Sequence, residues 1–218
     1  MCGRYTVLTE EEIIEIRGLL QSLSMRIVKD EFEEYDMRPG EVFPTNSAPA
    51  ITSDGEGGIS FESAKWGFKK FSGPGVIINA RSETIRVKSM FSRLIKGGRC
   101  VIPAGEFFEW EKLEKKKRKH FAKDREGNIL FMAGLYRDSA EDGGREFVII
   151  TREAGDEMSR IHDRQPVILR ADQVEDWLSG RMSPEELKGI ECDLSVMPCD
   201  EEEAGQVMLT FPEENDGD

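Results

Sequence analysis

The sequence is short of the side chains that bind metals. It has two histidines and four cysteines, and no two of the cysteines have the C-x-x-C spacing of a zinc site. We therefore expect no metal centre, no cofactor and reduced thiols, as is usual in the cytoplasm. The cysteines are Cys2, Cys100, Cys192 and Cys199.

Long apolar segments are missing as well. No stretch approaches the roughly 20 apolar residues that cross a bilayer. The first residues are followed by a charged segment rather than by the apolar run of a signal peptide. We expect a cytoplasmic monomer with no membrane partner.

Positive charge is outnumbered overall but not locally, with 30 Lys or Arg against 43 Asp or Glu in the whole chain. The net charge is -13, yet residues 64–123 carry sixteen Lys or Arg against five acids, while residues 199–218 carry eight acids and no Lys or Arg. Because binding responds to the local field, the acidic total does not exclude nucleic acid. The run 115–119 taken alone is expected to be a solvated loop.

The residue pattern predicts one α+β domain. Thr9 and Glu12 are typical of a capping box, and apolar residues at helical spacing predict a helix over residues 10–23. We predict a curled, barrel-like antiparallel β-sheet with a few peripheral helices in residues 1–198. Residues 199–218 are expected to form an acidic C-terminal segment that is partly disordered. The clearest strand candidates are Ile59–Trp66, Val76–Ile78, Cys100–Ile102, Phe107–Glu111, Ile129–Leu135, Phe147–Thr151 and a pair near Leu194–Met197 and Gln206–Thr210.

The most informative stretch is the start, Met1-Cys2-Gly3-Arg4-Tyr5. Removal of Met1 would leave an α-amine and a thiol on the same residue, Cys2. The amine has a pKa of roughly 7.7–8.0, so part of it is neutral and nucleophilic at cellular pH. An aldehyde would first form an imine with this amine, and the thiol could then close a five-membered thiazolidine ring.

Three further segments carry candidate catalytic groups. Asn79 and Arg81 follow a short apolar strand, so an amide and a guanidinium lie at a strand end. Glu109 has aromatic neighbours, which raise a carboxyl pKa and suit the group to acid–base work. His162 precedes an apolar strand. The other histidine, His120, lies among lysines and is expected at the surface.

Together these segments resemble the SOS response-associated peptidase family, also called abasic-site-processing proteins. The likeness covers roughly residues 2–170 and rests on six motifs in the family's order: M-C-G-R, N-x-A-P from Asn46, W-G at Trp66, N-A-R-x-E-T, R-C…P-A…F-F-E-W and H-D-R-x-P. The chain departs from the family at Ser89, where a basic residue is usual, and at Met197-Pro198-Cys199-Asp200, where H-P-V-S is common.

The resemblance implies a partner and a role for each matching residue. The partner is single-stranded DNA that contains abasic sites, including junctions with duplex. Cys2 would be the nucleophile that forms a covalent DNA–protein cross-link, and Asn79 would hold the cysteine amine and the sugar. Glu109 would move protons, also in removal of Met1, and His162 would promote opening of the deoxyribose ring. Self-processing and strand cleavage by β-elimination are further implied activities. Expected DNA contacts are Arg4, Asn46, Trp66, Arg81, Phe91, Trp110 and Arg164.

Two other readings of the sequence stay open at this point. Met-Cys-Gly also begins class II glutamine amidotransferases, in which the N-terminal cysteine attacks a glutamine amide. That reading gives no reason for the F-F-E-W and H-D-R-x-P segments. The second alternative is a non-enzymatic, acidic interaction protein with an incidental Cys2.

Overall fold

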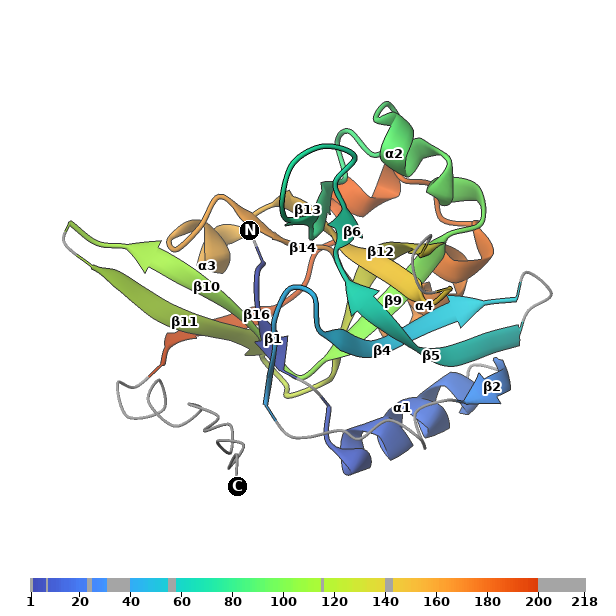
Figure 1. Ribbon diagram of the computed structural model, residues 1–218. Coiled ribbons are helices and arrows are strands. Elements are labelled where there is room, and N and C mark those ends of the chain that lie inside the picture. The colour runs from blue at the N-terminus through green and yellow to red at the C-terminus, as the bar shows by residue number, and fades with distance from the viewer. Residues whose placement is uncertain are drawn as a thin grey trace, which may run out of the picture.

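The computed structural model describes residues 2–6, 8–22, 25–30, 40–54, 58–114, 116–139 and 143–199 (Figure 1). Strands dominate the described chain, and the helices are few and short, as the sequence predicts. The strands are β1 (Tyr5–Thr6), β2 (Arg26–Asp30), β3 (Glu41–Val42), β4 (Ser47–Ser53), β5 (Gly58–Trp66), β6 (Phe68–Lys69), β7 (Val76–Ile77), β8 (Asn79–Arg81), β9 (Arg99–Ala104), β10 (Phe107–Lys112), β11 (Lys117–Asp124), β12 (Leu130–Asp138), β13 (Arg145–Glu153), β14 (Arg164–Pro166), β15 (Ile168–Leu169) and β16 (Leu194–Pro198). The helices are α1 (Glu10–Ser22), α2 (Ser89–Ser92), α3 (Asp156–Ser159) and α4 (Ala171–Ser179), with short 3-10 turns at Leu94–Lys96 and Glu186–Gly189.

Helix α1 begins where its capping box predicts. The Glu12 backbone N–H donates to the Thr9 hydroxyl, and the Thr9 N–H donates back to the Glu12 carboxylate, at 3.2 and 2.6 Å. Ile13, Ile16 and Leu20 share one helical face and are buried. This face packs into the larger hydrophobic core, so the helix covers one side of the sheet.

The main sheet closes on itself. Strands β4, β5, β13, β12 and β9 pair in a ring, which confirms the predicted curled sheet. The β13–β5 contact that closes the ring is parallel, although most other pairings are antiparallel. Alternate residues of β13 enter two cores, because successive side chains of a strand point to opposite faces. The buried residues of α1 and α4 belong to the larger core, which also contains Val148 and Ile150 of β13, so these two helices lie outside the closed sheet.

A second sheet has the strand order β16-β11-β10-β1-β3. Its strand β1 carries Tyr5, which packs in the same core as side chains of the ring. Its β10–β11 hairpin reaches away from the body of the protein (Figure 1). The expectation of a solvated loop at residues 115–119 was wrong from Lys117 onward, because strand β11 begins there and pairs with β10. Strand β16 pairs with β11, while the partner predicted near Gln206–Thr210 lies outside the described residues.

Candidate functional site

Cys2 lies in a fully enclosed place at the start of the second sheet. Its side chain is 0 % exposed and belongs to the second hydrophobic core. The Asn79 side-chain amide donates to the Cys2 carbonyl oxygen at 2.7 Å, and the Cys2 thiol lies 3.7 Å from the Arg4 carbonyl oxygen. A residue 77 positions away thus fixes the backbone of the second residue.

Glu109 approaches Cys2 through strand pairing. Tyr5 pairs with Phe107 in antiparallel β1 and β10, and the Phe108 N–H donates to the Arg4 carbonyl. The chain before Tyr5 therefore runs along the outer half of β10, where Glu109 is buried. Burial, first, and the negative charge of Glu109, second, raise the pKa of the Cys2 thiol to about 12. The thiol is neutral at physiological pH in the chain that retains Met1.

Asn79 owes its place to the way in which β8 continues β5. Residues 145–147 of β13 pair with β5, and residues 149–151 of the same strand pair with β8. The Trp66 indole N–H donates to the Ile78 carbonyl oxygen at 3.0 Å and anchors the residue before Asn79. The Asn79 Oδ1 atom is buried and accepts no hydrogen bond from the described residues. One polar atom beside Cys2 is therefore available to a ligand.

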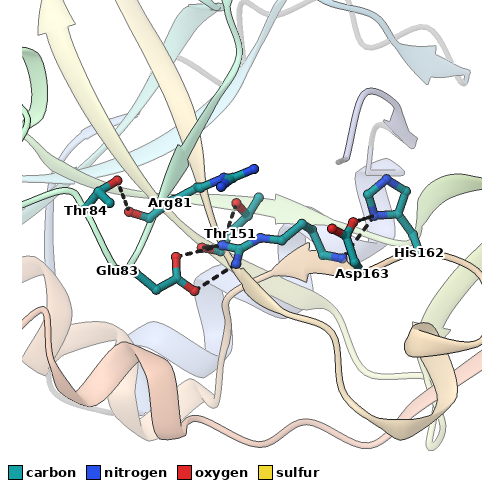
Figure 2. Close-up of polar contacts among 7 residues, drawn as sticks. Arg81, Glu83, Thr84, Thr151, His162 and Asp163 are labelled. Atoms are coloured by element: carbon teal, nitrogen blue, oxygen red, sulfur yellow. Dashed lines mark hydrogen bonds and ion pairs between the residues drawn. The ribbon is translucent and has the colours of Figure 1, made fainter.

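His162 lies on the turn between α3 and β14, at one side of the polar network in Figure 2. Its neighbour Ile161 packs against the core that contains Cys2. The His162 Nδ1 atom is 3.0 Å from the Arg164 N–H and 2.8 Å from an Asp163 carboxylate oxygen. A ring nitrogen cannot accept from one and donate to the other at once. We favour acceptance from Arg164, because that N–H is fixed by the backbone whereas the Asp163 side chain is 82 % exposed.

Arg164 is held by protein groups in this structure, and its expected contact with phosphate stays a prediction. Its guanidinium is 7 % exposed and donates to both carboxylate oxygens of Glu83, at 2.8 and 2.9 Å. It also donates to the Thr151 carbonyl oxygen at 2.7 Å. Figure 2 shows the Glu83 and Thr151 side chains close together, with dashed lines that mark their polar contacts. Arg164 therefore links β14 to β13 and to the turn after β8. These contacts help to fix the segments that carry Asn79 and His162.

Two expected base-stacking rings are also core residues. Trp66 is 0 % exposed and stacks on Phe147, with ring centroids 6.3 Å apart and planes within 2°. Phe91 is almost as fully buried and packs on Phe68. Both rings therefore contribute to the hydrophobic core in this structure, and their expected contacts with DNA bases stay predictions.

The remaining expected DNA contacts lie at the surface. The Arg4 guanidinium is 4.1 Å from the Phe43 ring centroid and 5.0 Å from the Trp110 ring centroid, and pairs with Glu41 at 3.0 Å. Asn46 is exposed, and its Oδ1 accepts from the Phe43 N–H in a turn. These positions leave the expected contacts possible and do not test them.

Arg81 differs from Arg4, because it is exposed and its guanidinium forms no hydrogen bond or ion pair with the residues that the structure describes. In Figure 2 its side chain points away from Glu83, although its charge still lowers the pKa of that carboxyl by a small contribution behind that of Arg164. Arg81 thus remains available to an anion.

His120, expected at the surface, is buried. It stands directly opposite Glu109 in the β10–β11 pairing, so both side chains point to the same face. Its Nε2 atom lies 3.7 Å from a carboxylate oxygen of Glu111. The lysines around His120 concealed the strand in the sequence, because charged residues weaken the alternation that identifies one.

Within the described ranges, no group of three or more His, Cys, Asp or Glu could hold a metal ion. None of the helices described there is long and apolar enough to cross a membrane.

The structure belongs to the class of α+β proteins built on a closed ring of strands, and the buried Cys2 lies in the same core as residues of that ring. Comparison with known proteins narrows that class. The chain belongs to the SOS response associated peptidase (SRAP) family, and its match to the family's sequence pattern covers residues 1–204.

Its relatives include YoaM of Bacillus subtilis (strain 168), named an abasic site processing protein, at 32 % identity over 99 % of this chain and 95 % of YoaM. YedK of Escherichia coli (strain K12) carries the same description, at 28 % identity over 87 % of this chain and 85 % of YedK. A crystal structure of a phage-related protein from Bordetella bronchiseptica shares the fold, with a TM-score of 0.71, 24 % identity and coverage of 91 % of this chain and 94 % of that chain.

Proposed function

We propose that this protein processes abasic sites by forming a covalent bond between Cys2 and the aldehyde of the damaged sugar in single-stranded DNA. The observation that carries this proposal is the convergence on Cys2 of an amide and a carboxylate from distant strands. Asn79 donates to the Cys2 carbonyl oxygen at 2.7 Å, and the charge of Glu109 acts on the Cys2 thiol. The abasic-site descriptions of YoaM and YedK support the substrate.

The reaction begins with loss of Met1, because the nitrogen of Cys2 is otherwise an amide and not a nucleophile. The freed amine attacks the aldehyde carbon of the ring-opened sugar and an imine forms as water leaves. The Cys2 sulfur then adds to the imine carbon, and the thiol proton passes to the nitrogen. The product is a thiazolidine; hydrolysis of the Met1–Cys2 bond consumes one water molecule, and the condensation of Cys2 with the aldehyde releases one.

The order of the steps follows from the two nucleophiles of Cys2. Once Met1 is lost, the α-amine, whose ordinary pKa is roughly 7.7–8.0, is partly neutral at cellular pH and can attack the aldehyde first. A glutamine amidotransferase would instead need the sulfur to attack first. That alternative assigns no role to the F-F-E-W and H-D-R-x-P segments, which the aldehyde reaction uses through Glu109 and His162.

The other groups act on protons and position. Glu109 is buried beside Cys2 and would accept and return protons during imine formation and during hydrolysis of the Met1–Cys2 bond. The Asn79 Oδ1 atom would accept from the freed amine or a sugar hydroxyl. His162 would donate a proton to the ring oxygen of the closed sugar as the ring opens. An imine that is not trapped by the thiol permits β-elimination, so strand cleavage is the expected side reaction.

The test combines intact mass with a denaturing gel. Purified protein should lack the mass of Met1, and incubation with a single-stranded oligonucleotide carrying one abasic site should give a shifted band that survives denaturation. An identical oligonucleotide without the abasic site is the control and should give no such band. A protein that has lost Met1 but leaves both oligonucleotides unshifted would refute the proposal.

A further inference from the structure

The β10–β11 hairpin concentrates positive charge that the rest of the protein does not balance. Many arginines elsewhere meet carboxylates, as Arg137 does Glu146 at 2.8 Å, although Arg81 meets none among the described residues. On the hairpin, Lys112, Lys117 and Arg118 are exposed and form no ion pair with any residue in the described part of the chain. Because the protein has a net charge of -13 and many carboxylates, a cluster of cations without a carboxylate partner suggests a site for an external anion.

Two of these cations, Lys112 and Lys117, lie on the same face of the hairpin as Lys119. Trp110 pairs with Lys119 and Lys112 pairs with Lys117, and residues directly opposite in an antiparallel pair point to the same face. Arg4 joins that face, because its guanidinium lies over the Trp110 ring. We call this surface the hairpin strip; it consists of Arg4, Phe43, Trp110, Lys112, Lys117 and Lys119.

The hairpin strip has too little negative charge of its own. Glu41 is the one carboxylate that ion-pairs with it among the described residues, and it is shared by Arg4 and Lys119. Further out, Lys112 and Lys117 face each other directly, and like charges at directly opposed positions destabilise a hairpin. A partner that supplies negative charge would relieve this repulsion.

Rings accompany the cations. Phe43 is 41 % exposed and Trp110 is partly exposed, and the two flank Arg4. Alternating cations and rings suit single-stranded nucleic acid, since the cations track phosphates and the rings stack on unpaired bases. The strip also begins two residues from Cys2 and runs outward along the hairpin (Figure 1).

We propose that the hairpin strip binds the single-stranded DNA that continues from the damaged nucleotide, with Lys112 and Lys117 on its phosphates. This inference rests on the proposed function for where the strand begins. It adds Lys112, Lys117 and Lys119 of the hairpin to the expected DNA contacts Arg4 and Trp110, and it explains why two lysines are placed opposite each other without a carboxylate partner among the described residues.

The experiment uses the full chain and an undamaged single-stranded oligothymidylate, followed by fluorescence anisotropy over a salt series. Lys117→Glu is compared with Lys188→Glu, which makes the same charge change at an exposed position on the 3-10 turn Glu186–Gly189. We expect Lys117→Glu to raise Kd about fivefold or more at low salt. The slope of log affinity against log salt should become shallower by about 0.7 or more, the value for one phosphate contact of a single strand. Lys188→Glu should keep the wild-type slope.

Thermal unfolding separates binding from folding. Lys117→Glu places a carboxylate opposite Lys112, so its unfolding midpoint should equal or exceed that of the wild type while its DNA affinity falls. Weaker binding that appears only together with a lower midpoint would overturn the proposal. So would a slope and an affinity indistinguishable from those of Lys188→Glu, or a loss that is larger on duplex of equal length.

Cross-linking to the abasic oligonucleotide tells the two proposals apart. At saturating DNA, Lys117→Glu should cross-link at the wild-type rate, and at limiting DNA more slowly, because the strip affects binding and not chemistry. If no variant cross-links, the proposed function fails, and the strip is still judged by the undamaged oligonucleotide.

Discussion

The main sheet and the hairpin of the open five-stranded sheet differ in how their charged side chains are paired. In the main sheet, Arg164 of β14 meets Glu83, which follows β8, and Arg145 of β13 meets Glu62 of β5. On the hairpin of the open sheet, Lys112 and Lys117 oppose each other and form no ion pair with any described residue. Pairs such as Arg164–Glu83 therefore mark places that stabilise the fold, and the two hairpin lysines mark a place where a ligand is expected.

The largest effect should come from the residue at the centre of the open-sheet site. Cys2→Ala should abolish the denaturation-stable adduct, because alanine keeps the amine but cannot close the ring. The labile imine should still be trapped by borohydride, which is checked on the same gel with and without the reductant. Cys192→Ala is the matched control, since that thiol lies elsewhere and receives a hydrogen bond from Gln165. A stable adduct of Cys2→Ala without reductant would exclude the thiazolidine.

Next in size are the groups assigned to proton transfer. Glu109→Gln and His162→Ala should slow cross-linking by about 10²–10⁴-fold, the usual contribution of general acid–base catalysis. Only Glu109→Gln should also slow the loss of Met1, as seen by intact mass, and its cross-linking rate is measured on the protein that has lost Met1. Single-turnover rates at saturating DNA measure the first effect. Wild-type rates in both variants would mean that the two assignments are wrong.

Much of the fold could be predicted because its signals are local. The capping box at Thr9 and Glu12 and the apolar strand after Arg145 need no knowledge of the rest of the chain. Cys2, Asn79 and Glu109 were predicted as one site, and the structure brings them together although their roles stay predictions. The acidic segment 199–218 was also predicted, but 200–218 lie outside the described residues.

Burial depends on long-range contacts that the sequence does not show. Arg81 and Arg164 look alike in the sequence, since each follows a polar motif beside an apolar strand. Only the tertiary partner separates them: Glu83 lies 81 positions before Arg164 in the chain and meets it across β13 and β14. The burial of Trp66 could not be predicted for the same reason, because it depends on Phe147 from a strand that closes the ring.

The same two arginines give the third prediction. Arg164→Ala removes the partner of a buried pair and should lower the free energy of unfolding by about 3 kcal/mol. Arg81→Ala should change it by no more than about 0.5 kcal/mol, yet weaken binding of single-stranded DNA and flatten its dependence on salt. Denaturant unfolding and anisotropy, run on both variants, measure the two quantities. Equal stability losses would show that burial does not distinguish these residues.

The smallest expected effect is on the pH dependence of thermal stability. It is tested by comparing two ion pairs that differ in burial. The hydrogen bonds from Arg164, above all, hold the pKa of the Glu83 carboxyl below its usual range. A carboxyl whose pKa is depressed by folding contributes stability above its unfolded pKa, about 4.3, and loses it as pH falls through the lower folded value. Glu83→Gln should therefore unfold at a lower temperature than the wild type near neutral pH, and the difference should shrink below about pH 4.

Glu185 is the matched control for that measurement. Arg86 also lowers the pKa of its carboxyl, but both side chains of this pair are more than half exposed. Water and salt screen such a pair, so Glu185→Gln should leave the unfolding midpoint unchanged across the same pH range. Thermal unfolding at several pH values decides between the two pairs. A pH-dependent loss of equal size in both variants would mean that the Glu83–Arg164 pair stabilises the ring no more than a surface contact does, and the contrast between paired and unpaired charge would lose its best example.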